Sequence, residues 1–242
     1  MTPRGGETPT VAQILTVPDI PPSLMQAVLG TIREGILRFC REEATSLNLS
    51  RVLIAFNGGK DCTLLVYLVV AVAEDISRSR EFTVHGAIRL LNIREESDPE
   101  IFTEIDQFAT ALSQQLGIQS IEIAGDMKFG LSQVSQNFPE VEAIFMGTRS
   151  TDPNAHWMKP FCLTSPGWPQ INLIAPLLEL SYHQVWRLID GLALEVCELY
   201  TRGYTSIGRK SNTKPNPLLR VSTGYKHARE LSDESMERLG RF

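Results

Sequence analysis

Seven consecutive residues, Asn-Gly-Gly-Lys-Asp-Cys-Thr at positions 57–63, carry groups that together could bind phosphate. The paired glycines, Gly58 and Gly59, allow backbone conformations closed to other residues and a close approach of the backbone to a ligand. A helix that begins here would direct its free N–H groups into the turn, where an anion is favoured. Lys60 adds a cation for phosphate charge, and Asp61 adds a carboxylate beside it. We therefore predict a phosphate-binding turn.

The same stretch also fits an ordinary turn between a strand and a helix. In that alternative, Asn57 would begin the turn, the glycines would relieve strain and Asp61 would cap the helix. Lys60 together with Asp61 is more than such a turn needs, which favours phosphate binding. The spacing matches neither G-x-x-x-x-G-K-[ST] nor G-x-G-x-x-G, so these two nucleotide-binding loops are excluded.

Apolar segments on both sides of the turn predict the elements that position it. Residues 52–56 are short, apolar and β-branched, as in a buried strand, and residues 64–72 fit a buried helix. Strands and helices then alternate along the chain, which predicts right-handed crossovers. The expected fold is α/β, an open, mostly parallel twisted sheet with helices on both faces. The other predicted strands are residues 83–91, 119–123 and 143–146, and the other predicted helices are residues 23–47, 100–116 and 129–137.

Ligands of such sheets bind at the carboxyl ends of the strands. Asn57 and residues 91–93 and 147–149 follow predicted strands, so we expect them at that edge. The chain is expected to form a single catalytic domain in three parts. These are a mobile N-terminal tail over residues 1–22, a nucleotide-binding core over residues 23–180, and a C-terminal subdomain over residues 181–242 that completes the site.

The composition is that of an ordinary soluble globular protein, with 43% hydrophobic and 21% charged residues. A formal net charge of −5 argues against a general nucleic-acid-binding surface, which would be basic. Residues 1–10 lack the apolar segment of a signal peptide, and no apolar run reaches the roughly 18 residues of a membrane span. The 4 cysteines are scattered without a C-x-x-C pair, so we expect reduced thiols, no zinc site and a cytoplasmic protein.

Five further stretches follow the turn in an order that indicates a family. The turn resembles the pyrophosphatase loop of the PP-loop superfamily, Ser-Gly-Gly-x-Asp-Ser, with Asn57 and Cys62 in place of its two serines. From about residue 23 onward the chain closely resembles the eukaryotic FAD synthases, the FMN adenylyltransferases of this superfamily. A Rossmann-like fold of the adenine nucleotide α-hydrolase type is therefore implied. The five stretches are Gly-Thr-Arg-Ser-Thr-Asp-Pro (147–153), Ser-Pro-Gly-Trp-Pro-Gln (165–170), Ser-Tyr-His-Gln-Val-Trp (181–186), Tyr-Thr-Arg-Gly-Tyr-Thr-Ser-Ile-Gly (200–208) and Asn-Thr-Lys-Pro-Asn-Pro (212–217).

The resemblance implies an enzyme that joins FMN to the AMP part of ATP, giving FAD and pyrophosphate, with Mg²⁺ required. Asp61 would help to hold Mg²⁺ against the ATP phosphates and Lys60 would offset their charge, so Asn57, Lys60 and Asp61 are the implied catalytic residues. Backbone groups at residues 91–93 would read the adenine edge. The implied ATP-binding residues are Phe56, Asn57, Gly58, Gly59, Lys60, Asp61, Cys62, Thr63, Ile93 and Gly147.

The resemblance also implies a flavin site. Trp168 would supply an apolar wall for the isoalloxazine ring. Two arginines near the end of the chain would hold the FMN phosphate, for which a planar guanidinium is suited, although such arginines are commonly just solvated. The implied flavin-binding residues are Arg149, Asp152, Pro153, Trp168, Pro169, Arg238 and Arg241.

This reaction needs no nucleophilic side chain and no general base, because the FMN phosphate is already ionised at neutral pH. Cys62 could have a lowered pKa at a helix N-terminus, but we expect it to serve as a small packing residue. We expect structural roles for the four histidines, His85, His156, His183 and His227.

Two alternatives stay open. A phosphoadenylyl-sulfate reductase-like enzyme on the same fold would need a nucleophilic cysteine in its C-terminal segment, where Cys197 is the last cysteine. A flavin- or nucleotide-binding module without catalysis would have no need of Asp61. The expected partners are the small molecules ATP and FMN, and client apoflavoproteins that receive FAD, without nucleic acid or membrane. We expect a monomer that consists of the synthase module alone.

Overall fold

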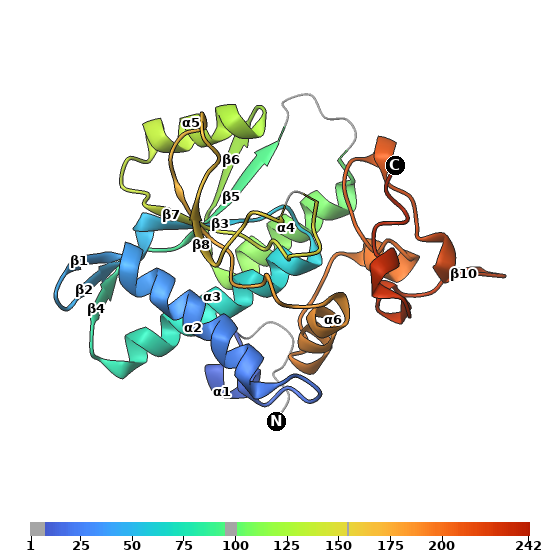
Figure 1. The fold of residues 1–242 in the computed structure, drawn as a ribbon, viewed down its shortest axis with the longest axis horizontal. Helices are drawn as coiled ribbons and strands as arrows, with labels where there is room; N and C mark the ends of the chain where they lie inside the picture. Colours follow the sequence, from blue (N-terminus) through green and yellow to red (C-terminus); the bar gives the residue numbers. More distant parts are fainter. Residues whose placement is uncertain (1–7, 95–100, 154) are drawn as a thin grey trace.

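A six-stranded sheet lies at the centre of the computed structural model, which describes residues 8–94, 101–153 and 155–242 (Figure 1). The strands have the order β6-β5-β3-β7-β9-β8, and every neighbouring pair is parallel except β8 and β9. This confirms the predicted open, mostly parallel sheet. The strands are β3 (Val52–Ala55), β5 (Arg89–Arg94), β6 (Ser120–Ala124), β7 (Ala143–Phe145), β8 (Phe161–Leu163) and β9 (Asn172–Ile174).

Helices cover both faces of this sheet. Ile54 of β3 belongs to the larger hydrophobic core, which it shares with α2, α3 and α6, whereas the preceding Leu53 faces the smaller core under α5. Successive side chains of a strand point to opposite faces, so β3 must be covered on both. The helices are α1 (Val11–Leu15), α2 (Pro22–Phe39), α3 (Lys60–Ser79), α4 (Thr103–Leu116), α5 (Met127–Asn137) and α6 (Tyr182–Gly191).

The sheet changes its winding direction beside β3. From β3 the chain moves outward to β5 and β6, and it then returns to add β7 and β9 on the other side of β3. A crevice forms where the strand order reverses, at the carboxyl ends of the strands. The predicted phosphate-binding turn follows β3 and therefore lies at this crevice.

The helix predicted over residues 23–47 ends earlier, at Phe39. The following residues form a hairpin of β1 (Arg41–Glu43) and β2 (Ser46–Asn48) instead. β2 pairs in parallel with β4 (Thr83–His85) in a separate three-stranded sheet, where Leu47 is fully buried. This long-range pairing overrides the local helical pattern.

The strand predicted over residues 83–91 is interrupted by Gly86. Its φ of +68° lies in the left-handed region, and a Cβ at this position would overlap the side-chain oxygen of Asn48. The chain thus leaves the small sheet at β4, turns at Gly86 and enters the large sheet as β5.

The N-terminal segment differs from the predicted mobile tail. Thr10 and Gln13 form a capping box that begins α1. Ile14, Val17 and Ile20 are buried in the larger core, so apolar burial fixes this segment. Residues 1–7 lie outside the described residues, as does the predicted start of α4 at residue 100.

The residues after α6 form short turns instead of long helices. Tyr200, Leu219 and Leu231 anchor this C-terminal region in the same core as α3. No helix in the described part of the chain is both long and apolar enough to cross a bilayer. The region contains 3-10 helices at Glu198–Arg202, Lys210–Asn212, Pro217–Leu219, Ala228–Glu230 and Glu234–Met236, and a hairpin of β10 (Arg220–Val221) and β11 (Gly224–Tyr225).

Candidate functional site

Local hydrogen bonds shape the turn between β3 and α3. Gly58 has a φ of +76°, and Gly59 precedes the first residue of α3. The side-chain oxygen of Asn57 accepts hydrogen bonds from the Gly59 amide and the Cys62 thiol, each at 3.0 Å. Thr63 donates from its hydroxyl to the Gly59 carbonyl at 2.8 Å. The side chains of Asn57, Cys62 and Thr63 therefore hold the turn together from within.

Cys62 is a buried packing residue in this turn. Burial raises the pKa of its thiol to about 12, so the thiol stays protonated at neutral pH. Gly147 of the loop after β7 lies directly against it, since a Cβ there would be 3.0 Å from the Cys62 amide nitrogen and Cα. Only glycine allows the two segments to approach this closely.

A cleft of about 670 Å³ lies at the carboxyl ends of β3, β5 and β7. The turn forms its floor, and the C-terminal region forms the opposite wall through Ser206, Gly208 and Arg241. Gly58 and Thr63, which we predicted to bind ATP, lie behind this lining. The other predicted ATP-binding residues all line the cleft: Phe56, Asn57, Gly59, Lys60, Asp61, Cys62, Ile93 and Gly147.

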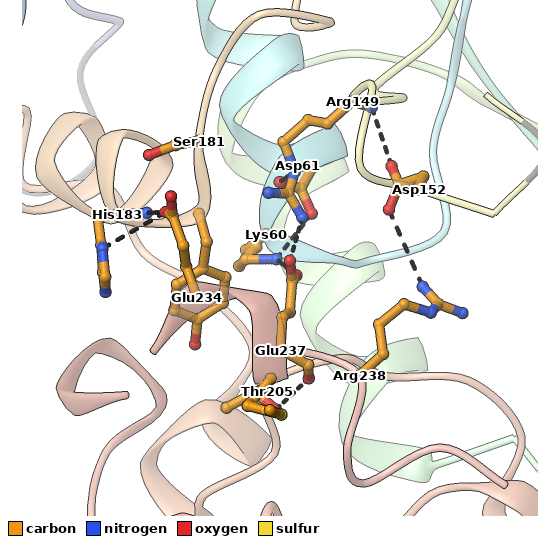
Figure 2. A network of polar contacts seen from close by, with 12 residues as sticks. Lys60, Asp61, Arg149, Asp152, Ser181, His183, Thr205, Glu234, Glu237 and Arg238 are labelled. Atoms are coloured by element: carbon orange, nitrogen blue, oxygen red, sulfur yellow. Dashed lines mark hydrogen bonds and ion pairs between the residues drawn. The ribbon is translucent and has the colours of Figure 1, made fainter. Parts of the chain in front are cut away.

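Four charged side chains form a closed network beside the turn (Figure 2). Lys60 Nζ lies 2.9 Å from Asp61 Oδ2 and 2.5 Å from Glu237 Oε1. Arg149 Nε lies 2.9 Å from Asp61 Oδ1, and the same guanidinium contacts the Glu237 carboxylate. Two cations and two carboxylates thus balance each other, which makes their burial tolerable.

Arg149 lies inside the protein. It is 1% exposed and is absent from the cleft lining, although we predicted contact with the flavin. Burial lowers the pKa of its guanidinium, but the carboxylates of Asp61 and Glu237 outweigh this effect and raise the pKa above its ordinary value. Its backbone amide donates to Asp152 Oδ2 at 2.9 Å, so Arg149 also shapes the loop that carries Asp152.

Glu237 is a member of this network that sequence reasoning missed. Its backbone carbonyl accepts a hydrogen bond from the Thr205 hydroxyl at 2.5 Å. The Asn216 side chain donates to Thr205 Oγ1 at 3.1 Å and to the Met236 carbonyl at 2.9 Å. These bonds fix Glu237 within the C-terminal region, and its ion pair with Lys60 joins that region to the start of α3. The only sequence signal was its place directly before Arg238.

Tyr200 was also missed as a site residue. Its hydroxyl accepts a hydrogen bond from the Lys60 amide at 2.7 Å, so it caps one of the free N–H groups at the start of α3. Burial raises the pKa of this hydroxyl well above its ordinary value, and the charge of Asp61 adds to the effect. Tyr200 therefore stays neutral and lines the cleft as a polar, uncharged group.

Three arginines of the C-terminal region line the wall of the cleft that faces the turn: Arg209, Arg238 and Arg241. Arg238 is 40% exposed in its side chain and lies 3.9 Å from Asp152 Oδ1. Burial lowers the pKa of Arg241, and the nearby charge of Arg238 lowers it further. Close cations of this kind favour an anionic ligand between them.

An apolar hollow of about 240 Å³ adjoins the cleft. Leu91, Ile93 and Met146 line both cavities, and Trp157 and Trp168 line the hollow alone. The strand end predicted to read adenine and the tryptophan predicted to contact the flavin ring therefore border one apolar space. Pro153 and Pro169 line neither cavity; the Pro169 carbonyl accepts a hydrogen bond from Thr164 at 2.6 Å, which shapes the loop before β9.

Three of the histidines, His85, His183 and His227, make side-chain contacts away from the cleft lining. His85 pairs with Glu42 at 2.8 Å, and His183 contacts the Leu231 carbonyl at 2.7 Å. His227 packs on Trp186 with ring centroids 5.2 Å apart. These contacts suit the structural roles that we predicted. No cluster of three or more metal-ligating side chains occurs among the described residues.

Comparisons of the sequence with known proteins identify one domain family and several relatives. Residues 129–215 match the model of the phosphoadenosine phosphosulfate reductase domain. A protein of Caenorhabditis briggsae named probable FAD synthase is 36% identical over 199 residues, which cover 80% of this chain and 36% of that protein. A protein of Schizosaccharomyces pombe with the same name is 32% identical over 206 residues, which cover 85% of this chain and 77% of that protein. The chain therefore spans about a third of the length of the Caenorhabditis briggsae relative.

A solved structure shares the whole architecture. The crystal structure of Candida glabrata FMN adenylyltransferase in complex with FMN and the ATP analogue AMPCPP is similar with a TM-score of 0.81. The alignment covers 96% of this chain and 93% of that chain, at 21% sequence identity. At this identity the likeness establishes the fold.

Proposed function

The chain belongs to the FAD synthase family, and from this membership we propose that it transfers the AMP part of ATP to FMN, giving FAD and pyrophosphate. One observation supports this activity more than any other. The predicted phosphate-binding turn and three arginines of the C-terminal region border one cleft, and that cleft adjoins an apolar hollow. Such a site can take two phosphorylated substrates, one of which carries a large flat ring.

In this proposal the ATP phosphates lie at the turn after β3. The N-terminus of α3 carries a partial positive charge, which favours phosphate. Lys60 contributes its charge at the edge of the cleft, although its ammonium group is held by Asp61 and Glu237. Asn57 keeps the turn in shape through its bonds to Gly59 and Cys62. The turn thus serves as a rigid support for the triphosphate.

We propose Asp61 as a ligand of Mg²⁺, with Asp152 as a second carboxylate in the same cleft. Asp61 Oδ1 lies near Arg149 Nε but makes no hydrogen bond with the described protein atoms, so a lone pair is left for a hard cation. Mg²⁺ is commonly held by one or two carboxylates together with substrate phosphates, which fits this donor set. When bound, the ion would neutralise charge on the ATP phosphates.

FMN would occupy the opposite wall and the hollow. Its isoalloxazine ring suits the apolar side chains around Trp168, since flat aromatic surfaces pack well together. Its phosphate would lie between Arg238 and Arg241, where two guanidinium groups line the cleft. Adenine would then lie in the cleft beside Ile93, within reach of the β5 backbone.

The reaction follows from this placement. A phosphate oxygen of FMN attacks the α-phosphorus of ATP in line, the new P–O bond forms and the bond to pyrophosphate breaks. FMN is already ionised, so no side chain needs to remove a proton. The protein contributes position and charge neutralisation, which are the main sources of catalysis in phosphoryl and nucleotidyl transfer.

The reductase-like alternative receives some support from the family model that matches residues 129–215. That chemistry needs a reactive cysteine. Cys197 is 1% exposed, and burial raises the pKa of its thiol, so it is unsuited to nucleophilic attack. Adenylyl transfer is therefore the better proposal.

The test asks which flavin accepts the adenylyl group. Purified protein is incubated with ATP and Mg²⁺ together with either FMN or riboflavin, and flavin products are separated by chromatography. We expect FAD from FMN and no adenylylated product from riboflavin, which lacks the attacking phosphate. A protein that binds ATP and FMN without forming FAD would be a binding module, and the proposal would be wrong.

A further inference from the structure

Glu237 reaches from the C-terminal segment to two cations on separate elements of the sheet core. Its carboxylate contacts Lys60, the first residue of α3, and Arg149 in the loop after β7 (Figure 2). The residue is 8% exposed, and the two cations are 2% and 1% exposed. A buried carboxylate with two such partners is not a solvated tail residue.

The contacts close a ring of alternating charge. Asp61 meets Lys60 and Arg149 on one side, and Glu237 meets the same two cations on the other. Removal of the Glu237 charge would leave both cations with Asp61 as their one carboxylate in the ring. A buried charge without its partner is strongly unfavourable, so Lys60 and Arg149 would shift, and the Asp61 carboxylate would shift with them.

The neighbouring residue faces another part of the cleft. Arg238 lies near Asp152 and lines the wall opposite the turn, while Glu237 lies against the turn itself. The bond from Thr205 to the Glu237 carbonyl holds the backbone between them. Two consecutive residues therefore serve the two sides of one cleft.

We propose that Glu237 is a positioning residue for the ATP side of the site. It acts through Lys60 and Arg149, which hold Asp61 and the loop after β7 in the geometry that ATP requires. This inference rests on the proposed adenylyl transfer. It adds a residue whose effect on ATP is distinct from the effect of its neighbour Arg238 on FMN.

The test compares Glu237→Gln with Glu237→Asp and with the control Glu234→Gln. Glu234 lies in the same segment and pairs with His183 at 3.4 Å, outside the cleft lining. For Glu237→Gln we expect kcat to fall about 10-fold and the KM for ATP to rise about 5-fold, with the KM for FMN within about 2-fold. Glu237→Asp keeps the charge and should recover part of the loss. Glu234→Gln should behave like the wild type.

A double-mutant cycle with Lys60→Gln tests whether Glu237 acts through Lys60. Because Glu237 acts through Lys60, the loss in the double variant should be clearly smaller than the product of the two single losses. Independent effects that multiply would overturn the inference. Circular dichroism and thermal unfolding of each variant measure the folded fraction; an activity loss that matches a loss of folded protein would show a structural role only, and would also overturn it.

Calorimetric titration keeps this test separate from the test of the activity. AMPCPP with Mg²⁺, and FMN alone, are titrated into the wild type and Glu237→Gln. We expect AMPCPP to bind about 5-fold more weakly to the variant, with FMN binding unchanged. If the wild type makes no FAD, the proposed function fails, but this comparison still decides whether Glu237 positions the nucleotide side. Equal AMPCPP affinities would contradict the inference.

Discussion

The two sides of the cleft are built in different ways. The side chains inside the turn after β3 bond to residues at most five positions away, such as Asn57 with Cys62. The opposite wall is held by bonds between distant parts of the chain, such as Thr205 with Glu237 and Lys214 with Gly240. Most of the bonds of the turn are therefore local, whereas the wall depends on contacts between segments far apart in the sequence. The first side is therefore suited to a rigid support and the second to a substrate that needs a large surface.

The network of Lys60, Asp61, Arg149 and Glu237 joins these two sides. Asp61 belongs to the local side and Glu237 to the distant one. Variants on each side should therefore differ in which substrate they affect, and the following predictions run from the largest expected effect to the smallest.

Asp61→Ala should have the largest effect and should lower FAD formation by at least about a thousandfold. The variant removes the proposed Mg²⁺ ligand and leaves Lys60 and Arg149 with too little negative charge. Initial rates of FAD formation measure the effect. The control is Glu74→Ala on the same helix, whose side chain pairs with Arg78 on the surface. Turnover of Asp61→Ala near that of the wild type would show that Asp61 is not a ligand of the metal.

Gly147→Ala should disturb the turn through packing. Its new Cβ would lie 3.0 Å from the Cys62 backbone, so the loop after β7 must move away from α3. We expect kcat/KM for ATP to fall about 10-fold or more and the free energy of unfolding to fall by about 1–3 kcal/mol. Gly30→Ala on the exposed side of α2 is the control, because no atom lies within 4 Å of its added Cβ. Equal behaviour of the two variants would mean that the close approach does not matter.

Arg238→Ala combined with Arg241→Ala should affect the other substrate. We expect the KM for FMN to rise about 10-fold and the KM for ATP to stay within about 2-fold, because the two proposed contacts with the FMN phosphate are lost. Steady-state kinetics with each substrate varied in turn measures both constants. Arg220→Ala, on the exposed strand β10, should match the wild type. A rise in the KM for ATP alone would show that the two arginines bind ATP and that their assignment to FMN is wrong.

Acid should destabilise the folded protein through His227, which lies in the C-terminal region away from the cleft lining. Burial lowers the pKa of His227 from 6.5 to about 4, and the charge of Arg229 adds to this effect. Between these values the unfolded chain binds a proton that the folded protein does not, so the free energy of unfolding falls as the pH drops from about 6.5 to about 4. Because the ring is partly exposed, we expect a loss of only about 1 kcal/mol.

Urea unfolding at pH 7 and at pH 4.5 tests this expectation. His227→Gln should lose less stability over this range than the wild type and the control His85→Gln, whose ring pairs with Glu42 on the small sheet. If His227→Gln loses as much stability as the wild type, another group is responsible for the acid sensitivity.

The sequence alone located the turn that borders the cleft, although Gly58 and Thr63 lie behind the cleft lining. Asn57, Lys60 and Asp61 are contiguous with the glycines that shape their turn, so their types and spacing carry the information. The alternation of apolar strands and helices likewise predicted the parallel sheet. Residues 41–48 were misjudged because their pairing with β4 lies far away along the chain, beyond the reach of a local pattern.

The distant side could be predicted only in part. Arg238 and Arg241 were found through the family resemblance, but a lone acidic residue such as Glu237 in an irregular segment carries no local signal. Arg149 was predicted to contact the flavin, but it is buried beside Glu237 and Asp61, and this ion pairing with a distant residue has no local signal. Tyr200 was missed because its hydrogen bond to the Lys60 amide joins residues that are 140 positions apart.

The most direct measurement of the central claim uses ATP labelled with ³²P at the α-phosphorus. This ATP is incubated with FMN and Mg²⁺, and the products that contain the label are identified. Adenylyl transfer predicts that the label appears in FAD and that unlabelled pyrophosphate forms in an equal amount. Labelled AMP and pyrophosphate without labelled FAD would mean that water takes the adenylyl group, and would contradict the account.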